Sequence, residues 1–212
     1  MKINIHPAKR RQAKAFTLIE MIGVLAVIAI LAALLIPKIF DAINNARVNN
    51  TAVSYNTVKA AVMDHYAKFG TLLSSNGTAM VTTDAGALTF DRTLLTEGFL
   101  DKPFQVKIGD GTALTHIEIA SGSATNIPVS GINAAYDLDG NDSTVNDASP
   151  ASAVVQAVIT GVTEADARDL NDRLDGASLG GAVGAADLKG RVKYAAVPSG
   201  GTTTVYVYLS HR

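Results

Sequence analysis

The sequence contains no cysteine and no tryptophan, and both absences limit what the protein can be. Without cysteine the chain forms no disulfide, zinc–thiolate site or iron–sulfur cluster, and it has no thiol nucleophile. Charged residues reach only 17%, against about 25% in average globular usage. With 48% hydrophobic residues the chain is too apolar for a disordered protein. Its formal net charge of −1 gives no electrostatic support for nucleic-acid binding.

The few charges are unevenly placed near the beginning of the chain. Residues 1–15 contain no acid and five bases, which are Lys2, Lys9, Arg10, Arg11 and Lys14. Residues 16–36 then contain one charged side chain, that of Glu20. As an α-helix this second segment would be about 30 Å long, which is the thickness of a bilayer core. Because basic residues ahead of a span stay on the cytoplasmic side, we expect everything after Pro37 on the far side of a membrane.

Two simpler interpretations of this segment explain less of it. A secretory signal peptide has a shorter apolar run of ~7–15 residues and a cleavage site of small residues, whereas Pro37 and Lys38 follow the run here. A plain signal anchor fits the length but does not explain Glu20. A carboxylate costs roughly 2.5–3.5 kcal/mol near the bilayer centre and less near the interface. Glu20 therefore either lies in the headgroup zone or has a functional role, and an acid inside a span favours the second interpretation.

The residues around Glu20 resemble a known signal. Lys14-Ala15-Phe16-Thr17-Leu18-Ile19-Glu20 is similar to the type III signal of type IV prepilins and type II secretion pseudopilins. This resemblance implies cleavage by a prepilin peptidase between Ala15 and Phe16, followed by N-methylation of Phe16. It also implies that Glu20 of one subunit neutralises the Phe16 amine of its neighbour during assembly. Ala15 stands where the family usually has glycine, but its side chain is still small.

The function implied by the resemblance is structural and not enzymatic. The chain would be a subunit of a type IV pilus or of a pilus-like type II secretion filament. Its partners would be copies of itself, related pilins, the prepilin peptidase, an inner-membrane assembly platform and, before assembly, membrane lipid, with no nucleic acid. It would begin as a single-pass protein of the inner (cytoplasmic) membrane with its head outside the cytoplasm, and end in an extracellular pilus or a periplasmic pseudopilus. The alternative is a membrane-anchored extracytoplasmic binding module, dependent on calcium or not, whose helix is only an anchor.

The expected organisation has four parts: a cleaved basic leader (1–15), a transmembrane and assembly helix (16–36), an amphipathic helical stalk (37–70) and a globular head (71–212). Pro37 removes a backbone donor inside the helical pattern, which predicts a kink. Beyond it, apolar residues follow at helical spacing on two stripes, which are Ile39, Ile43, Ala46 and Val53, and then Tyr55, Val58, Val62, Tyr66 and Phe69. We expect the head to pack on the second stripe.

The head is expected to contain two short helices and five strands. The helices are 91–97, with Asp91 as N-cap, and 164–174, capped by Thr163 and ended by Asp175-Gly176. The strands are 104–108, 114–120, 153–160, 191–197 and 203–209, and residues 198–201 join the last two as a hairpin. Residues 178–190 are expected to form a loop. The predicted class is α+β, a long N-terminal helical spine packed by a small antiparallel sheet, and the family resemblance implies the same. Segments 170–176 and 190–192 also loosely resemble a sequence motif found in some larger prepilins, and we assign no function to it.

The one candidate metal site lies in an acidic segment of the head. Asp137, Asp139 and Asn141 place oxygen atoms two residues apart around Gly140, which is a spacing that calcium loops use. The alternative is a solvated acidic turn, because Asp, Asn and Gly form turns without a metal. Many pilins fix this C-terminal region with a disulfide, which the present chain cannot form. Calcium is therefore the one cofactor that the sequence suggests.

Other chemistry is sparse. The histidines have no metal-ligand spacing and are His6, His65, His116 and His211. No P-loop or dinucleotide-binding glycine pattern is present. We therefore expect no enzyme.

Overall fold

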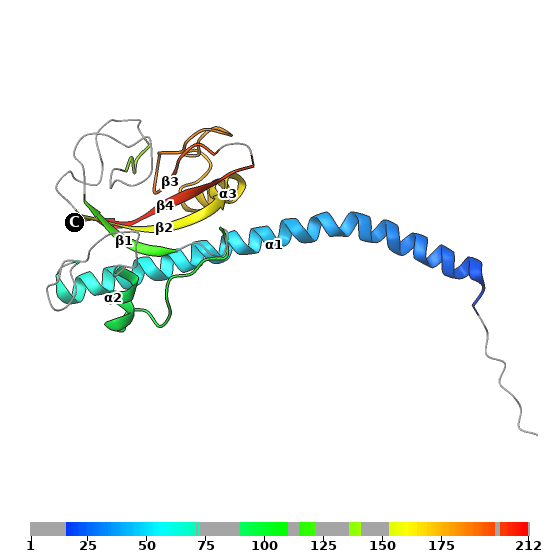
Figure 1. Ribbon diagram of the computed structural model, residues 1–212, viewed down its shortest axis with the longest axis horizontal. Helices are drawn as coiled ribbons and strands as arrows, with labels where there is room; N and C mark the ends of the chain where they lie inside the picture. Colours follow the sequence, from blue (N-terminus) through cyan, green and yellow to red (C-terminus); the bar gives the residue numbers. More distant parts are fainter. Residues whose placement is uncertain are drawn as a thin grey trace, which may run out of the picture. The chain divides into compact units, whose positions relative to one another are not determined.

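The computed structural model of this chain describes residues 16–70, 72, 90–109, 115–121, 136–140, 153–197 and 200–211. Within these ranges the elements follow in the order α1 (Leu18–Phe69), α2 (Phe90–Thr96), β1 (His116–Ser121), β2 (Ala153–Thr163), α3 (Glu164–Leu174), β3 (Val192–Tyr194) and β4 (Thr202–His211). The predicted α+β class, with a long N-terminal helix and a small antiparallel sheet, is confirmed (Figure 1). The chain divides into two compact units, of which the first ends at Ile43 and the second begins at Asn44.

The sheet of the second unit has the strand order β1-β2-β4-β3, and every neighbouring pair is antiparallel. One line of cross-strand partners shows how the sheet is held together. Ile117 of β1 pairs with Ala157 of β2, Ala157 with Val207 of β4, and Val207 with Val192 of β3. All four side chains are at most 1% exposed. Such β-branched and small apolar pairs are what a half-buried pleated surface favours.

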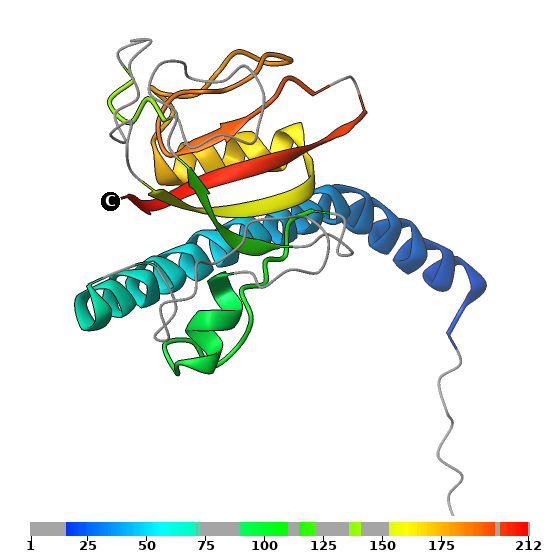
Figure 2. The same cartoon turned by 60° about the vertical axis from the view of Figure 1, so that its left-hand side comes forward.

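The main core lies between this sheet and the second half of α1. Figures 1 and 2 both show the helix running along one face of the sheet. Six of the buried α1 residues follow at spacings of three and four, as one helical face requires, and are Val48, Thr51, Tyr55, Val58, Val62 and His65. Ala61, beside Val62, is buried as well. The Tyr55 hydroxyl also donates a hydrogen bond of 2.7 Å to the carbonyl oxygen of Tyr208. Burial raises the pKa of Tyr55 to about 12, so this hydroxyl remains a donor at neutral pH.

A second, smaller cluster covers the other side of β2 and β4, and consists of Tyr136, Leu138, Val154 and Tyr208. As a result every residue from Val154 to Ile159 is buried. A strand that is covered on both faces reads as a nearly continuous apolar run rather than as an alternation. This segment has that pattern except at Gln156, whose Oε1 accepts a hydrogen bond from the Tyr136 hydroxyl. The strand continues to Thr163 after an irregular step between Ile159 and Val162. Gly161 stands in that step with a φ of +65°, a conformation that favours glycine.

One prediction about the stalk was wrong in detail. The seam continues from Val62 to the fully buried His65, whereas Tyr66 is 39% exposed. The error arose because a polar histidine was passed over in favour of a neighbouring aromatic residue. The other predicted stripe, on which the head was not expected to pack, is exposed: Ile39, Ile43 and Val53 are 46%, 48% and 64% exposed.

The predicted strand 104–108 does not form. Phe104 and Ile108 are buried in the main core, but no ladder joins their segment to the sheet. The carbonyl oxygen of Lys107 accepts its hydrogen bond from the Arg47 side chain of α1, at 2.8 Å. Apolar residues at alternating positions can therefore pack into a core from an irregular segment. This is possible when side chains supply hydrogen-bond partners for backbone groups of that segment.

The remaining elements differ from prediction mainly at their ends. Helix α2 begins one residue early, so Asp91 lies in its first turn and is not its N-cap. Strand β3 has three residues, fewer than predicted, and it pairs with β4 as the hairpin prediction requires. Helix α3 begins as expected, because the Thr163 hydroxyl accepts a hydrogen bond from the Asp166 amide at 3.3 Å.

Candidate functional site: the exposed apolar helix

The side chains at the start of α1 form a capping box. The Thr17 hydroxyl accepts a hydrogen bond from the backbone N–H of Glu20 at 3.3 Å. In return, Oε2 of Glu20 accepts hydrogen bonds from the Thr17 amide and hydroxyl, both at 2.8 Å. This reciprocal arrangement satisfies donors that the first turn of a helix otherwise leaves free. Glu20 therefore has a local reason to stand at the third helical position, and both of its bonds to Thr17 use the same oxygen.

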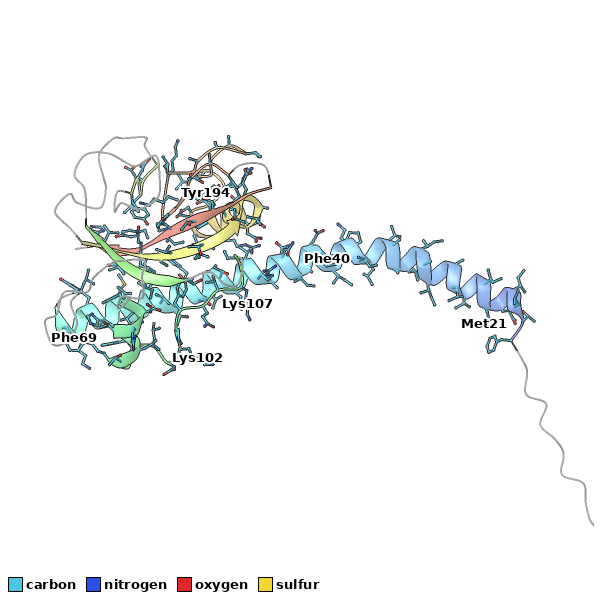
Figure 3. The ribbon with its side chains drawn as sticks, viewed as in Figure 1. Met21, Phe40, Phe69, Lys102, Lys107 and Tyr194 are labelled. Atoms are coloured by element: carbon cyan, nitrogen blue, oxygen red, sulfur yellow. The ribbon has the colours of Figure 1, made fainter. Side chains whose placement is uncertain are left out.

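The first part of α1 is apolar on every face and exposed on nearly all of them. From Phe16 to Ile43 each side chain is exposed except Ala32, which is half-buried. Phe16 and Leu18 are 80% and 79% exposed, and the side chains of Met21 and Phe40 extend outward from the helix (Figure 3). The helix is long and apolar enough to cross a membrane. So large an apolar surface is unfavourable in water, and it marks a membrane or protein contact.

Pro37 lies inside α1, which is helical on both sides of it. The predicted kink there stays a prediction, as do the roles of the cleavage-site residues. Phe16 precedes the helix and is exposed. Ala15 and the leader lie outside the described residues.

The predicted calcium ligands are only partly described. Asp137 is 2% exposed, and its carbonyl oxygen accepts a hydrogen bond from the Gly190 amide at 2.6 Å. Asp139 is exposed, and Asn141 lies outside the described residues. Within the ranges that the structure describes, no three His, Cys, Asp or Glu side chains group in a way that could hold a metal ion. The calcium site stays a prediction.

A lysine ammonium lies beside the same segment. The Nζ atom of Lys193 is 4.0 Å from the centroid of the Tyr136 ring, a cation–π distance. Lys193 is only 1% exposed. The hydroxyl of Tyr136 is bonded at 2.6 Å to Oε1 of Gln156 on β2. Protein side chains thus attach the start of the acidic segment to the sheet.

Two polar clusters that the sequence analysis did not assign hold the C-terminal part of the head together. In the first, Asp175 at the end of α3 accepts hydrogen bonds from the amides of Arg191 and Val192, at 2.7 and 2.8 Å. Its other oxygen accepts from Nε of Arg191 at 2.8 Å, and the same guanidinium donates to the Leu174 carbonyl. These contacts join segments 170–176 and 190–192. In the sequence these two segments stood out only through their loose resemblance to larger prepilins. Their spacing along the chain does not show that they contact each other.

The second cluster surrounds the buried side chain of Asp187, which is 1% exposed. Its Oδ2 accepts hydrogen bonds from the side-chain amide (Nδ2) of Asn171 at 2.8 Å and from the backbone N–H of Gly181 at 3.0 Å. Its Oδ1 accepts from the Lys189 backbone at 3.3 Å. Burial raises the pKa of Asp187 above its ordinary value, although the backbone hydrogen bonds oppose this. One carboxylate therefore ties the loop 178–190 to α3.

His65 forms the centre of a third contact, near the end of α1. Its Nε2 lies 2.9 Å from Oε2 of Glu97. Its ring centroid lies 5.0–5.4 Å from those of Phe69, Phe90 and Phe99. The histidine thus fixes α2 and the following turn against the stalk, which is a structural role.

The comparison with protein families finds one match. Residues 10–36 match the model described as the prokaryotic N-terminal methylation motif. This motif is the prepilin signal of type IV pilins and pseudopilins, and together with the apolar helix it fits a membrane-anchored protein with a structural role. No curated protein and no solved structure gives a significant match to the chain.

Proposed function

Because the chain carries a prepilin signal of the type IV pilin and pseudopilin family, we propose that it is a structural subunit of a type IV pilus or of a pilus-like type II secretion filament. A prepilin peptidase cleaves between Ala15 and Phe16, and the new Phe16 amine is methylated. Before assembly, the subunit resides in the inner membrane with its head outside the cytoplasm. An assembly platform then stacks the apolar helices of successive copies, and of related pilins, into a filament core.

The observation that carries this proposal is the exposed apolar surface of residues 16–43, in which Glu20 is the one acid before Asp41. Among the described residues of its own compact unit, this surface has no partner. Lipid can cover it before assembly, and equivalent helices can cover it afterwards. A tethered binding module would need only the first of these two environments.

Glu20 supports the same proposal by its geometry. Both contacts with Thr17 end on Oε2, and a carboxylate has about four lone-pair positions. Oε1 is therefore available for the ammonium of Phe16 in a neighbouring subunit. In an apolar filament core two separate charges are each unfavourable, while a hydrogen-bonded pair offsets much of that cost. Pairing would occur at one axial register only, which would give the filament a fixed rise.

The test is to replace Glu20 with Gln, which retains an oxygen for the Thr17 capping contacts but removes the charge. We expect filament yield to fall roughly tenfold or more, because an unpaired buried charge costs several kcal/mol, while the membrane-inserted monomer accumulates normally. Asp41→Asn, an exposed acid beyond the apolar run, is the matched control. Yields would be measured in sheared filament and membrane fractions. Normal filament yield from E20Q would refute the pairing role, whereas a wild-type chain that forms no filaments would favour the anchored-module alternative.

A further inference from the structure

Lys193 of β3 is buried on the face of the sheet that lies away from α1. Its neighbour Val192 belongs to the main core, and successive side chains of a strand point to opposite faces. Lys193 pairs with Tyr206 of β4, whose ring centroid lies 5.9 Å from Nζ. The lysine is only 1% exposed, although lysine is almost never fully buried unless it is paired. Such burial indicates aromatic or negative groups arranged around the ammonium.

The ammonium lies at the start of the acidic segment. Nζ is 4.0 Å from the ring centroid of Tyr136, the residue directly before Asp137. The backbone of Asp137 forms a β-bridge with Lys189 and accepts the bond from the Gly190 amide, so the segment lies beside the chain that leads into β3. Asp137 is itself only 2% exposed. One buried cation and one buried acid therefore occur in the same small region of the head.

Other protein groups fix the described part of the acidic segment in place. The Tyr136 hydroxyl is bonded to Gln156 of β2, and its ring packs on that of Tyr208 with the centroids 5.4 Å apart. At the other end, Gly140 lies so close to Leu179 that a Cβ atom there would be 2.3 Å from the Cδ2 atom of the leucine. Side-chain packing and hydrogen bonding thus hold the segment from Tyr136 to Gly140.

A calcium ion fits poorly into this arrangement. Calcium needs about six to eight oxygen ligands, with carboxylates among them, and a nearby positive charge opposes its binding. The buried acid that would have to be a ligand, Asp137, lies in the region of the Lys193 ammonium, and Asp139 is exposed. The positive charge that an ion would bring to the segment is therefore already present in the chain.

We propose that the ammonium of Lys193 takes the place of calcium, as an internal cation that neutralises the acidic segment and holds it on the sheet. The head then has the same stability with and without calcium, and the calcium site predicted at Asp137, Asp139 and Asn141 is not a metal site in this chain. The inference concerns the head alone and does not depend on the proposed filament function.

The first test is the response of the wild-type chain to calcium. A ligand that binds only the native state raises the midpoint of thermal unfolding. For the full chain in a non-ionic detergent we expect the same midpoint in excess calcium chloride and in EGTA. Terbium, a calcium analogue whose luminescence a nearby tyrosine sensitises, should give no signal that calcium displaces, although Tyr136 directly precedes Asp137. A higher midpoint in calcium, or a displaceable terbium signal, would overturn the inference.

The second test removes the charge. Lys193→Met retains most of the apolar stem, and we expect a lower midpoint in EGTA that rises when calcium is added, because the ion then supplies the missing charge. Lys193→Arg keeps the charge and should not respond to calcium. Lys102→Met, at an exposed lysine, is the matched control and should behave as wild type.

Two results with K193M would contradict the role of the ammonium. One is a midpoint equal to that of wild type, and the other is a lowered midpoint that calcium does not raise. If K193M does not fold, the calcium responses of wild type and K193R still decide, since a rise in either midpoint would overturn the inference.

Discussion

The two parts of α1 have the same secondary structure but opposite relations to water. Up to Ile36 the helix is apolar on every face except at Glu20, and nearly all side chains before Asn44 are exposed. After Asn44 it is amphipathic, and Val48 and Val62 are completely buried against the head. Burial of apolar surface stabilises a fold at about 25 cal/mol per Å². The second part of α1 buries its apolar side chains against the head of its own chain. The first part can bury its apolar side chains only in lipid or against other molecules.

Charged groups show the same contrast. In the head, the buried carboxylates of Asp175 and Asp187 accept hydrogen bonds from their own chain. Within the part of the chain that the structure describes, the carboxylate of Glu20 has the capping contacts with Thr17, one turn away. These two carboxylates of the head are thus satisfied within their own chain, whereas the carboxylate of Glu20 can still accept a hydrogen bond from a partner outside it.

The largest expected effects come from placing one aspartate in each region. Val207→Asp puts an unpaired carboxylate at a position that is 1% exposed, and should destabilise the head by more than about 4 kcal/mol. Ile28→Asp, at 55% exposure, should leave thermal unfolding of the head unchanged but abolish filaments. Circular dichroism in detergent and filament yield measure the two effects. If I28D assembled normally, the contrast between the regions would not hold.

A smaller effect is expected from Asp175→Ala. The substitution leaves the amides of Arg191 and Val192 and the Arg191 guanidinium without their acceptor. We expect a loss of about 3 kcal/mol in the free energy of unfolding, measured by urea denaturation of the full chain in detergent. Asp172→Ala, exposed on the same helix, should change stability by less than about 0.5 kcal/mol. Equal effects of both variants would show that the contacts of Asp175 with Arg191 and Val192 contribute little to the free energy of unfolding.

Asp187 should give the head a distinct pH dependence. Its pKa is raised in the native state, so the native state binds this proton more tightly than the unfolded chain does. The contribution of Asp187 to the free energy of unfolding therefore falls as pH rises from 3.8 through the raised pKa. Asp187→Asn has no proton to lose, and its amide can donate to Oδ1 of Asn171, a buried atom without a hydrogen-bond partner among the described residues.

Denaturation of both chains at several pH values between 4 and 7 checks this prediction. The stability of D187N relative to wild type should increase with pH across that window. Parallel profiles for the two chains would show that Asp187 does not titrate differently on folding.

The smallest effect is expected from Arg173→Ala. Its guanidinium donates to the side chains of Asn45 and Asn49, close to the point where the head begins to cover α1. Because these groups are exposed, we expect a loss of only about 1 kcal/mol. A loss above about 3 kcal/mol in thermal or urea unfolding would mean that this contact holds the whole head on the stalk.

The sequence predicted the first region better than the second because the first depends on local pattern. A run of 21 residues with one acid, preceded by bases, is recognised without knowledge of the fold. The N-cap of α3 at Thr163 was predictable for the same reason, since a cap involves residues only three positions apart. The roles of Ala15, Phe16 and Glu20 in processing and assembly remain predictions.

The head was harder to predict because its decisive contacts join distant residues. Asp175 meets Arg191 across 16 positions, and Arg47 meets Lys107 across 60. The second of these bonds occupies a backbone carbonyl of the predicted strand 104–108, and no periodicity in the segment itself reveals it. His65 was missed because a buried histidine needs a partner, and Glu97 approaches it only in the folded chain.

The mass of the N-terminal peptide from sheared filaments tests the central claim most directly. If the apolar helix polymerises after the leader is removed, assembled subunits begin at Phe16 and carry one additional methyl group on its amine. Assembled subunits that retain residues ahead of Phe16 would contradict the account, because no Phe16 ammonium would then exist to pair with Glu20 of a neighbour.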